Sequence, residues 1–331
     1  MARLLLFNPS HEMALAADAA QYTPPKQIQQ MEADLCRLPL LWAEEGDVVL
    51  TSDVVVDPTF VPAPWGWNKS VRNRFLRMGI SPALMPSEQQ LNAWRTYSAR
   101  SWSVDYCNSL YKMNKEKGLV PNHFRSLCSK ADYEAWLSAY GSAPFIVKSE
   151  YSSSGRGNRI FTSHLSPLTF HNPSVIDTFY DKVLDFAMEF EVTGQDVRYL
   201  GLSVFEASRE GRYAFNYLRS QQQLREMIAC HLPTPSVIDR LVEIHRQLLS
   251  DRLLGHYEGI AGIDMMVVRG GLVHPCVEIN LRMNMGVVAM ILYEKGLTSL
   301  PRSPYGGHSF YPVIEDGKFY IAYSSAPSSE Q

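Results

Sequence analysis

Lys148-Ser149-Glu150-Tyr151-Ser152-Ser153-Ser154-Gly155-Arg156-Gly157 begins as a strand and runs into a turn rich in hydroxyl groups and glycine. Much later in the chain, Asp264 opens a second polar pattern, which closes with Glu278-Ile279-Asn280-Leu281-Arg282. There an acid, an amide and a base alternate along what reads as a strand. Backbone N–H groups and cations bind phosphates, and hard oxygen ligands bind the metal that accompanies a nucleotide triphosphate. The two stretches together predict one site for such a pair, and therefore an enzyme.

Length and composition set wide bounds on the fold. A chain of 331 residues is too long for one ordinary core, so we expect roughly two or three domains. A hydrophobic content of 46% with 20% charged residues is typical of a soluble globular protein. The formal net charge of −3 gives no reason to expect a nucleic-acid partner. The apolar run Leu4–Phe7 is too short for a signal peptide, and no run reaches the length of a membrane span, so no membrane partner is expected.

The cysteines are odd in number and form no CxxC pair: Cys36, Cys107, Cys128, Cys230 and Cys276. This pattern favours buried, reduced thiols and a cytoplasmic protein.

The first part of the chain predicts a small open α/β domain that ends near residue 95. Arg3–Phe7 reads as a buried strand, and Ser10 can cap a helix over about residues 11–20. Apolar Asp47–Leu50 and Val54–Val56 suggest further strands. The proline- and tryptophan-rich segment Pro58–Asn68 reads as an ordered loop.

The middle of the chain has clear start and stop signals. Ser129 with Asp132 predicts the start of a helix that ends at Gly141, and strand Pro144–Ser149 follows. In that strand Ile146 and Lys148 face one side, opposite to Phe145 and Val147. The chain then returns through the turn at Ser152–Asn158 as a second strand of a hairpin.

Two longer elements follow. Lys182–Val192 and Val197–Ala207 read as a hairpin, and Thr234-Pro235 opens a helix that reaches about Leu254. His245 lies on the apolar face of that helix and is most simply a core or boundary histidine.

The last hairpin allows a geometric prediction. Strand Ile260–Val268 turns at Arg269-Gly270-Gly271 into Leu272–Asn280. A three-residue turn pairs Val268 with Leu272 and places Asp264, Glu278 and Asn280 on one face, whereas a two-residue turn separates Asp264 from the other two. We predict the three-residue turn, because three oxygen-bearing side chains in apolar strands need a shared polar partner.

Mg²⁺ is the partner that these oxygens indicate, since it takes one or two carboxylates and completes its shell with phosphates and water. The alternative is a set of surface polar residues on an edge strand. For Lys148 the alternative is a solvated strand residue, and for the Ser-Gly turn it is an ordinary hairpin loop.

From about residue 95 to 295, the chain resembles the ATP-grasp superfamily, which contains D-alanine–D-alanine ligase, biotin carboxylase and carbamoyl-phosphate synthetase. The matching elements are Lys148, the loop Ser152–Gly157, the acid-bearing linker Asp177-Thr178-Phe179-Tyr180, and Asp264 with Glu278-x-Asn280-x-Arg282. The resemblance implies an α/β (α+β) chain with the ATP-grasp fold. A small α/β domain (1–95) would precede a small subdomain with the phosphate loop (96–180) and a large subdomain with the metal site (181–331).

The resemblance also implies a role for each matching residue. Lys148 would contact the α-phosphate and the adenine edge, and backbone N–H groups of Ser153, Ser154, Gly155, Arg156 and Gly157 would close over the β- and γ-phosphates. Asp177, Thr178, Phe179 and Tyr180 would form the hinge that reads adenine, and Asp185 would hold the ribose hydroxyls. Asp264, Glu278 and Asn280 would hold one or two Mg²⁺ ions, for which Mn²⁺ could substitute. Arg282, with Lys148, would act in catalysis by stabilising the transferring phosphoryl group or the acyl-phosphate.

The chain departs from the family pattern at several positions. Arg100 stands where the family usually has an earlier lysine, and Arg and Lys are not equivalent phosphate ligands. The hinge acid is Asp177 in place of the usual Glu. Arg212, followed by Arg219, is the best candidate for a further phosphate contact.

In the family, a domain before the ATP-grasp core helps to bind the second substrate. This implies that Asn8, His11 and Glu12 lie near the cleft, while the alternative is helix capping by Ser10 with solvent-facing neighbours. Tyr22–Lys26 and Tyr305–His308 are each either a further wall of the cleft or a plain loop.

The leading functional hypothesis is an ATP- and Mg²⁺-dependent ligase. ATP would phosphorylate a small-molecule or peptide carboxylate, and an amine or thiol would then displace phosphate. The alternatives are a nucleotide-binding module without catalysis and a phosphotransferase on the same scaffold. The acid, the nucleophile and the oligomeric state, a homodimer included, stay open.

Overall fold

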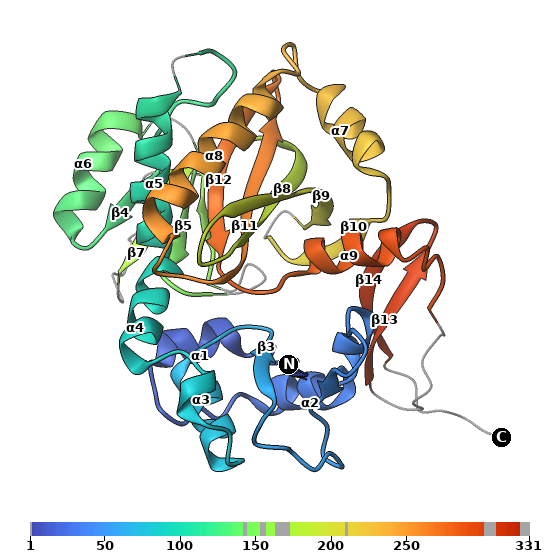
Figure 1. The fold of residues 1–331 in the computed structure, drawn as a ribbon. Helices are drawn as coiled ribbons and strands as arrows, with labels where there is room; N and C mark the ends of the chain where they lie inside the picture. Colours follow the sequence, from blue (N-terminus) through green and yellow to red (C-terminus); the bar gives the residue numbers. More distant parts are fainter. Residues whose placement is uncertain are drawn as a thin grey trace.

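In the computed structural model, the described residues are 2–114, 116–141, 144–152, 157–162, 173–208, 211–300 and 309–324. Within them the strands form a three-stranded, a four-stranded and a seven-stranded sheet. Figure 1 shows the N-terminal helices below the seven-stranded sheet and its helices.

The N-terminal sheet is parallel, with β1 (Arg3–Leu6) between β2 (Val48–Val49) and β3 (Val61–Pro64). Helices α1 (His11–Ala17), α2 (Lys26–Asp34) and α3 (Lys69–Arg77) accompany it, with the short helices η1 (Leu38–Leu41) and η2 (Pro82–Leu84). This confirms an open α/β arrangement, with β1 where the sequence predicts a strand.

Three local predictions for this region are wrong. Residues 54–56 form no strand, and Val55 is 92% exposed, so it lacks a neighbour to pair with. The third strand instead lies inside the segment predicted as a loop, where edge strand β3 tolerates Pro62 and Pro64 because its outer side needs no N–H donors. Ser10 occupies the N-cap position of α1, but its side chain makes no capping hydrogen bond, and the helix ends at Ala17.

The four-stranded sheet is antiparallel, in the order β4 (Arg125–Leu127), β7 (Ser174–Thr178), β5 (Phe145–Ser149), β6 (Arg159–Phe161). Helix α6 (Lys130–Tyr140) packs on it, and the predicted capping box of Ser129 with Asp132 is present. Phe145 and Val147 are buried against α6, so Ile146 and Lys148 face the other side, as predicted.

The seven-stranded sheet has the order β12 (Leu272–Asn280), β11 (Gly259–Val268), β8 (Lys182–Val192), β9 (Val197–Ala207), β10 (Tyr213–Tyr217), β14 (Lys318–Ser324), β13 (Ser309–Glu315). Both predicted hairpins, β8–β9 and β11–β12, are confirmed. Helices α4 (Glu88–Tyr97), α5 (Arg100–Met113), α7 (Gln221–Ala229) and α8 (Val237–Leu253) share one hydrophobic core with this sheet, while α9 (Met285–Glu294) packs in a second cluster. His245 on α8 is fully buried and its Nδ1 lies 3.0 Å from the Tyr106 hydroxyl, so it is a core histidine.

One face of β8 builds the core and the other faces a cavity. Leu184, Phe186, Met188 and Phe190 belong to the core, and the alternating Asp185, Ala187 and Glu189 line the cavity. Because α5 shares its core with the seven-stranded sheet, it packs with the larger body. The boundaries near residues 95 and 180 remain predictions.

The β11–β12 turn confirms the predicted register. Val268 pairs with Leu272, so the turn uses Arg269, Gly270 and Gly271, and both glycines have a positive φ. Farther along, Met266 pairs with His274 and Asp264 with Glu278, so β12 advances four residues while β11 advances two. The irregularity contains Pro275, which has no N–H to donate. Because the extra length is even, Asp264, Glu278 and Asn280 still share a face.

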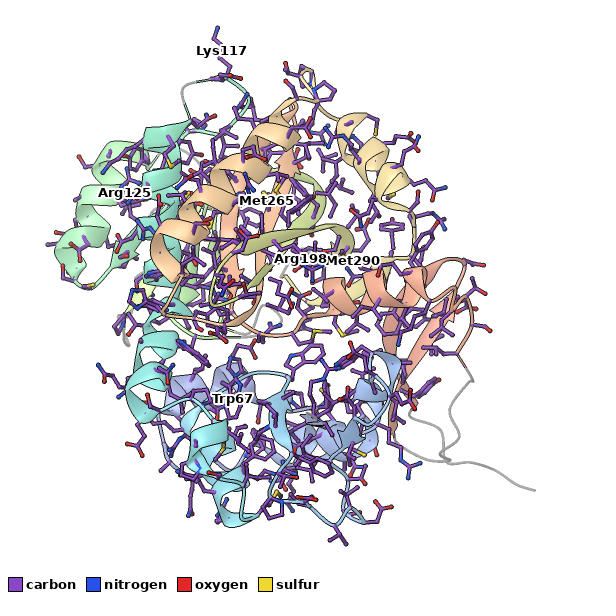
Figure 2. The ribbon with its side chains drawn as sticks, viewed as in Figure 1. Trp67, Lys117, Arg125, Arg198, Met265 and Met290 are labelled. Atoms are coloured by element: carbon purple, nitrogen blue, oxygen red, sulfur yellow. The ribbon has the colours of Figure 1, made fainter. Side chains whose placement is uncertain are left out.

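The N-terminal part meets the C-terminal part at the β13 edge of the seven-stranded sheet. Strand β13 contacts α2, and the Phe310 amide lies 3.4 Å from a carboxylate oxygen of Asp34. Figure 2 shows Trp67 in the lower, N-terminal part and Met265 in the upper part on β11. Trp67 packs against both the N-terminal cluster and the large core, so the two parts share apolar contact.

No helix among the described residues is both long and apolar enough to cross a bilayer.

Candidate active site

A cavity of about 1080 Å³ lies where the two larger sheets and the N-terminal domain meet. Lys148 and Ile146 reach it from β5, Asp264 from β11, Glu278 and Asn280 from β12, and Glu12 from α1. Two sequence stretches that are far apart in the chain therefore face one space. The two stretches belong to different sheets, as expected if they bind a ligand from opposite sides.

Lys148 presents a half-buried ammonium group to the cavity. Among the described residues, its Nζ has no hydrogen-bond or ion-pair partner, although Arg100, Glu278, Asp177 and Asp264 are near enough to act on it electrostatically. Burial and the neighbouring Arg100 lower the pKa of Lys148, and the three carboxylates oppose them. An ammonium group in this position is suited to an anionic ligand.

The predicted hinge residues Asp177, Thr178, Phe179 and Tyr180 all line the cavity. The buried Asp177 carboxylate accepts hydrogen bonds from the Thr178 amide at 2.8 Å and from His274 Nε2 at 2.7 Å. The Phe179 amide donates to the Pro144 carbonyl at 2.7 Å. Two of the hinge amides are thus engaged within the protein, and the adenine-reading role of this segment stays a prediction.

Asp185 also lines the cavity, where Lys182 forms an ion pair with it. Burial raises the pKa of Asp185, and Lys182 opposes that shift. Lys182 Nζ also donates to the Ala207 carbonyl at 3.2 Å. Sequence reasoning missed Lys182, since a lysine at the start of a strand resembles a solvated residue; its spacing of three from Asp185 is the available signal.

Arg212, the predicted further phosphate contact, is exposed near the β9–β10 turn and does not line the cavity. Arg219 is exposed as well and lies against Gly317. Lys182 is a cation that lines the cavity beside Asp185.

Asp264, Glu278 and Asn280 are brought together as predicted. Asp264 lies directly opposite Glu278, and Asn280 Nδ2 donates to Asp264 Oδ2 at 3.1 Å. Burial, with the charges of Glu278 and Glu189, raises the pKa of Asp264 to about 8. Strand β12 is an edge strand, as in the alternative interpretation, yet these side chains face the cavity and not bulk solvent.

This set of donors fits a hard cation. Two facing carboxylates and an amide oxygen are the ligand types that Mg²⁺ prefers, and a cation between them would offset the mutual repulsion of the Asp264 and Glu278 carboxylates. Among the described residues, no three or more His, Cys, Asp or Glu side chains are grouped to hold a metal by themselves. Mg²⁺ bound here would therefore depend on phosphate and water for part of its coordination.

Arg100 connects the phosphate-loop strand to the predicted metal site. It is 3% exposed at the start of α5, and its Nη1 donates to the Ser149 carbonyl at 2.6 Å and to Ser152 Oγ at 2.7 Å. Its Nη2 lies 2.8 Å from both carboxylate oxygens of Glu278. The sequence placed Arg100 in the phosphate site and gave no indication of this ion pair.

The predicted phosphate loop is only partly described. Ser153, Ser154, Gly155 and Arg156 lie outside the described residues. Gly157 has φ +79°, and a Cβ there would approach Ser149 Oγ to 2.7 Å. A side chain at this position would therefore disturb the end of β5.

Arg282 joins the metal-site strand to the N-terminal domain. Its Nε donates to a Glu12 carboxylate oxygen, its Nη2 to Asn280 Oδ1 at 3.1 Å and its Nη1 to the Met283 carbonyl at 3.1 Å. Burial raises the pKa of Glu12, but Arg282 and His11 outweigh it and the net shift is downward. Glu12 is thus a carboxylate at the boundary between the two parts.

Asn8 and His11, predicted with Glu12 for the acceptor substrate, instead make contacts inside the N-terminal domain. Asn8 exchanges two hydrogen bonds with the backbone of Gly66, at 2.9 and 3.2 Å. The buried His11 ring packs on Gly66, where a Cβ would come within 2.5 Å, and burial lowers the pKa of His11 to about 4. Glu12 alone of the three lines the cavity.

Glu189 is a buried acid that sequence reasoning missed. Glu189 accepts hydrogen bonds from Ser203 Oγ at 2.9 Å and from Asn284 Nδ2 at 2.8 Å, and all three line the cavity. Gly262 and Gly286 leave room for its carboxylate, since a Cβ on either would approach it to 2.6 Å or less. The available signal was an acid on the same strand face as Asp185.

No protein-family model matches the sequence, and no curated protein sequence matches it. Solved structures do match. N5-carboxyaminoimidazole synthetase from Staphylococcus aureus, complexed with ADP, is 12% identical with a TM-score of 0.50, over 91% of this chain and 79% of that chain. A biotin carboxylase–β-γ-ATP complex from Campylobacter jejuni is 15% identical with a TM-score of 0.50, over 91% of this chain and 72% of that one.

Both of these solved structures are ATP-grasp enzymes, and this chain has the ATP-grasp fold. The resemblance read from the sequence is thereby confirmed at the level of the fold. Fold alone does not define function, so the chemistry of this chain depends on the side chains that line the cavity.

Proposed function

We propose that this chain is an ATP- and Mg²⁺-dependent ligase, in which ATP phosphorylates a carboxylate substrate and an amine or thiol then displaces phosphate. The observation that carries the proposal is the single cavity that faces Lys148 from one sheet and Asp264, Glu278 and Asn280 from another. Phosphoryl transfer needs mainly positioning and charge neutralisation, which is what such a lining supplies. The two solved structures of similar fold are complexes with ADP and with β-γ-ATP, which supports a nucleotide as one substrate.

Each polar group of the cavity has a task in this proposal. Lys148 binds the phosphates through its ammonium group, which has no partner among the described residues, and Arg100 holds the strand end from which the phosphate loop departs. Asp264, Glu278 and Asn280 would hold Mg²⁺, which when bound would neutralise phosphate charge. Arg282 stabilises the phosphoryl group in transit.

The protein itself needs no nucleophile for this reaction, because the acid attacks the nucleotide and the amine or thiol attacks the activated acid. Burial raises the pKa of Cys107 and Cys276, which keeps both thiols protonated and poorly reactive. This agrees with a ligase in which the substrates supply the reacting groups.

The test is release of ADP and phosphate by the purified chain with Mg-ATP, while acids and amines are added separately and together. A ligase releases both products only when an acid and a nucleophile are present. A nucleotide-binding module releases neither, and a phosphotransferase gives ADP and a phosphorylated product with one acceptor alone. Either of these last results contradicts the proposal.

Glu278→Gln sharpens this test, because the amide keeps hydrogen-bonding capacity toward Arg100 but loses the charge that faces Asp264. We expect the rate of ADP release to fall about 100-fold or more. Glu243→Gln, on the exposed face of α8, is the matched control and should keep the parental rate.

A further inference from the structure

The cavity has a second end whose lining is apolar. Ile28 and Met31 on α2, with Leu35 at the C-cap of this helix, follow one another at helical spacing and form one wall. Further walls come from the end of β1, the end of β3, α9, β13 and β14. The apolar compartment is defined by Phe7, Ile28, Met31, Leu35, Trp65, Met285, Phe310 and Ile321.

This compartment lies apart from the nucleotide-binding lining. All of its members except Ile28 belong to one hydrophobic cluster, formed by α2, η1, α9 and the β13–β14 hairpin. The hinge and Lys148 belong to the other side of the cavity, on the four-stranded sheet. Figure 1 shows α2, α9 and β13 gathered at one side of the molecule, away from β5 and β7.

The size of the cavity leaves room for a second ligand. Pockets for single drug-sized ligands measure about 300–1000 Å³. This cavity measures about 1080 Å³, so one nucleotide does not account for the whole space.

The junction between the two ends is formed by the Arg282–Glu12 pair and by Asn280. A guanidinium group has five N–H donors, and within the described residues Arg282 uses three of them, one each from Nε, Nη1 and Nη2. Two N–H groups are left for a ligand, and the guanidinium fork matches a carboxylate. Arg282 is also next to the Asp264–Glu278 metal site through Asn280.

We infer that the acid activated by this chain is a monocarboxylate with an apolar aliphatic or aromatic body. Its carboxylate lies at Arg282, within reach of the transferred phosphoryl group, and its body fills the apolar compartment. A second charged group on that body would lose its hydration against the apolar side chains of the compartment. This inference rests on the proposed ligase function for the identity of the reacting group.

A homologous series of ligands tests the inference directly. Straight-chain monocarboxylates of increasing length, and the matching 2-amino acids, are titrated calorimetrically with Mg²⁺ and a non-hydrolysable ATP analogue present, and again without nucleotide. Burial of one methylene group stabilises a complex by about 0.8 kcal/mol, so affinity should rise about fourfold per methylene until the compartment is full. Dicarboxylates of equal length should bind at least about tenfold more weakly.

Comparison of the simple acids with the 2-amino acids shows whether the substrate is a plain monocarboxylate or an amino acid. If the simple acids and the amino acids show the same rise, the apolar body alone is recognised. If only the amino acids show it, the substrate carries an ammonium group, and the Glu12 carboxylate at the junction is a cavity acid that can pair with it. Both results support the inference, and an affinity that is independent of chain length in both arms overturns it.

A substitution on α2 supplies the matching protein-side test. Met31→Gln keeps the length and helix propensity of the side chain but makes the wall polar. The affinity for the acids should then no longer rise with their chain length, while the affinity for the nucleotide analogue should stay unchanged. Gln27→Ala, on the exposed face of α2, should keep the full dependence. If the nucleotide analogue does not bind the parental protein, the proposed function is refuted. If the analogue binds but the affinity for the acids does not depend on their chain length, only the inference of an apolar acid substrate is refuted.

Discussion

At the scale of single residues, Arg100 makes the contacts that hold the site together before any ligand binds. Its guanidinium group bonds to Ser149, Ser152 and Glu278, so one side chain fixes the end of β5 and the acid on β12. A lysine offers a point charge and could not span these partners with the same fork. The arginine therefore has a structural reason to stand where the family pattern usually has lysine.

Replacing Arg100 tests this account by stability. Arg100→Met leaves the Glu278 carboxylate without its cation, and we expect a loss of about 2–3 kcal/mol in the free energy of unfolding. Glu278→Gln in the same chain removes the uncompensated charge, so the double variant should be more stable than the sum of the single effects predicts. Urea denaturation measures all of these free energies.

The control is the exposed pair Lys130–Glu134 on α6, where the same cycle should give a coupling below about 0.5 kcal/mol. Simple additivity for Arg100 and Glu278 would show that their contact contributes nothing to the fold.

At the scale of elements, the β11–β12 hairpin shows which features a sequence can predict. The turn length and strand parity follow from the glycines and from the polar side chains, and both are confirmed. The register shift at Pro275, where β12 uses four residues against two of β11, was not predictable. Proline cannot donate a hydrogen bond between the strands, but this does not determine how many residues are inserted. Similarly, β3 contains two prolines, and only its place at the sheet edge explains why it is a strand.

Helix caps give a prediction at this scale. Ser220 accepts a hydrogen bond from the Gln223 amide at the start of α7, whereas Ser236 at the start of α8 makes no side-chain capping bond. Ser220→Ala should lower the free energy of unfolding by about 1 kcal/mol, and Ser236→Ala should change it by less than about 0.5 kcal/mol. Equal effects in denaturation experiments would mean that the capping bond is not what stabilises α7.

At the scale of the whole molecule, contacts between distant segments build the cavity. The order of the motifs predicted the fold and the meeting of Lys148 with Glu278. It could not predict that Glu12 pairs with Arg282, or that β13 contacts α2, because the motifs assign no partner to Glu12 and include neither α2 nor β13. Asn8 and His11 show the converse: their place near a strand end suggested a ligand, and their partners are Gly66 and Asn68.

Buried histidines make global stability depend on pH. Burial lowers the pKa of His245 from 6.5 to about 3, and that of His11 from 6.5 to about 4. The folded chain therefore binds fewer protons than the unfolded chain below pH 6.5, and stability that is present above this pH is lost on acidification. For His245 the loss should reach about 2 kcal/mol at pH 5.

Melting temperatures measured from pH 7 to 5 check this expectation. His245→Gln should melt lower than the parent at pH 7 and lose less on acidification, and His231→Gln, an exposed control, should keep the parental slope. An unchanged slope in His245→Gln would rule out His245 as a source of acid sensitivity.

The central claim is that Lys148 and Glu278 act on one Mg-nucleotide from opposite sheets. The most direct measurement is calorimetric affinity for a non-hydrolysable ATP analogue with and without Mg²⁺, in the parent, Lys148→Ala, Glu278→Gln and the exposed control Lys130→Ala. We predict that Lys148→Ala loses about tenfold or more in both conditions, and that Glu278→Gln loses most of the gain that Mg²⁺ gives the parent. If both variants bind the analogue as tightly as the parent, with the same response to Mg²⁺, the claim is contradicted.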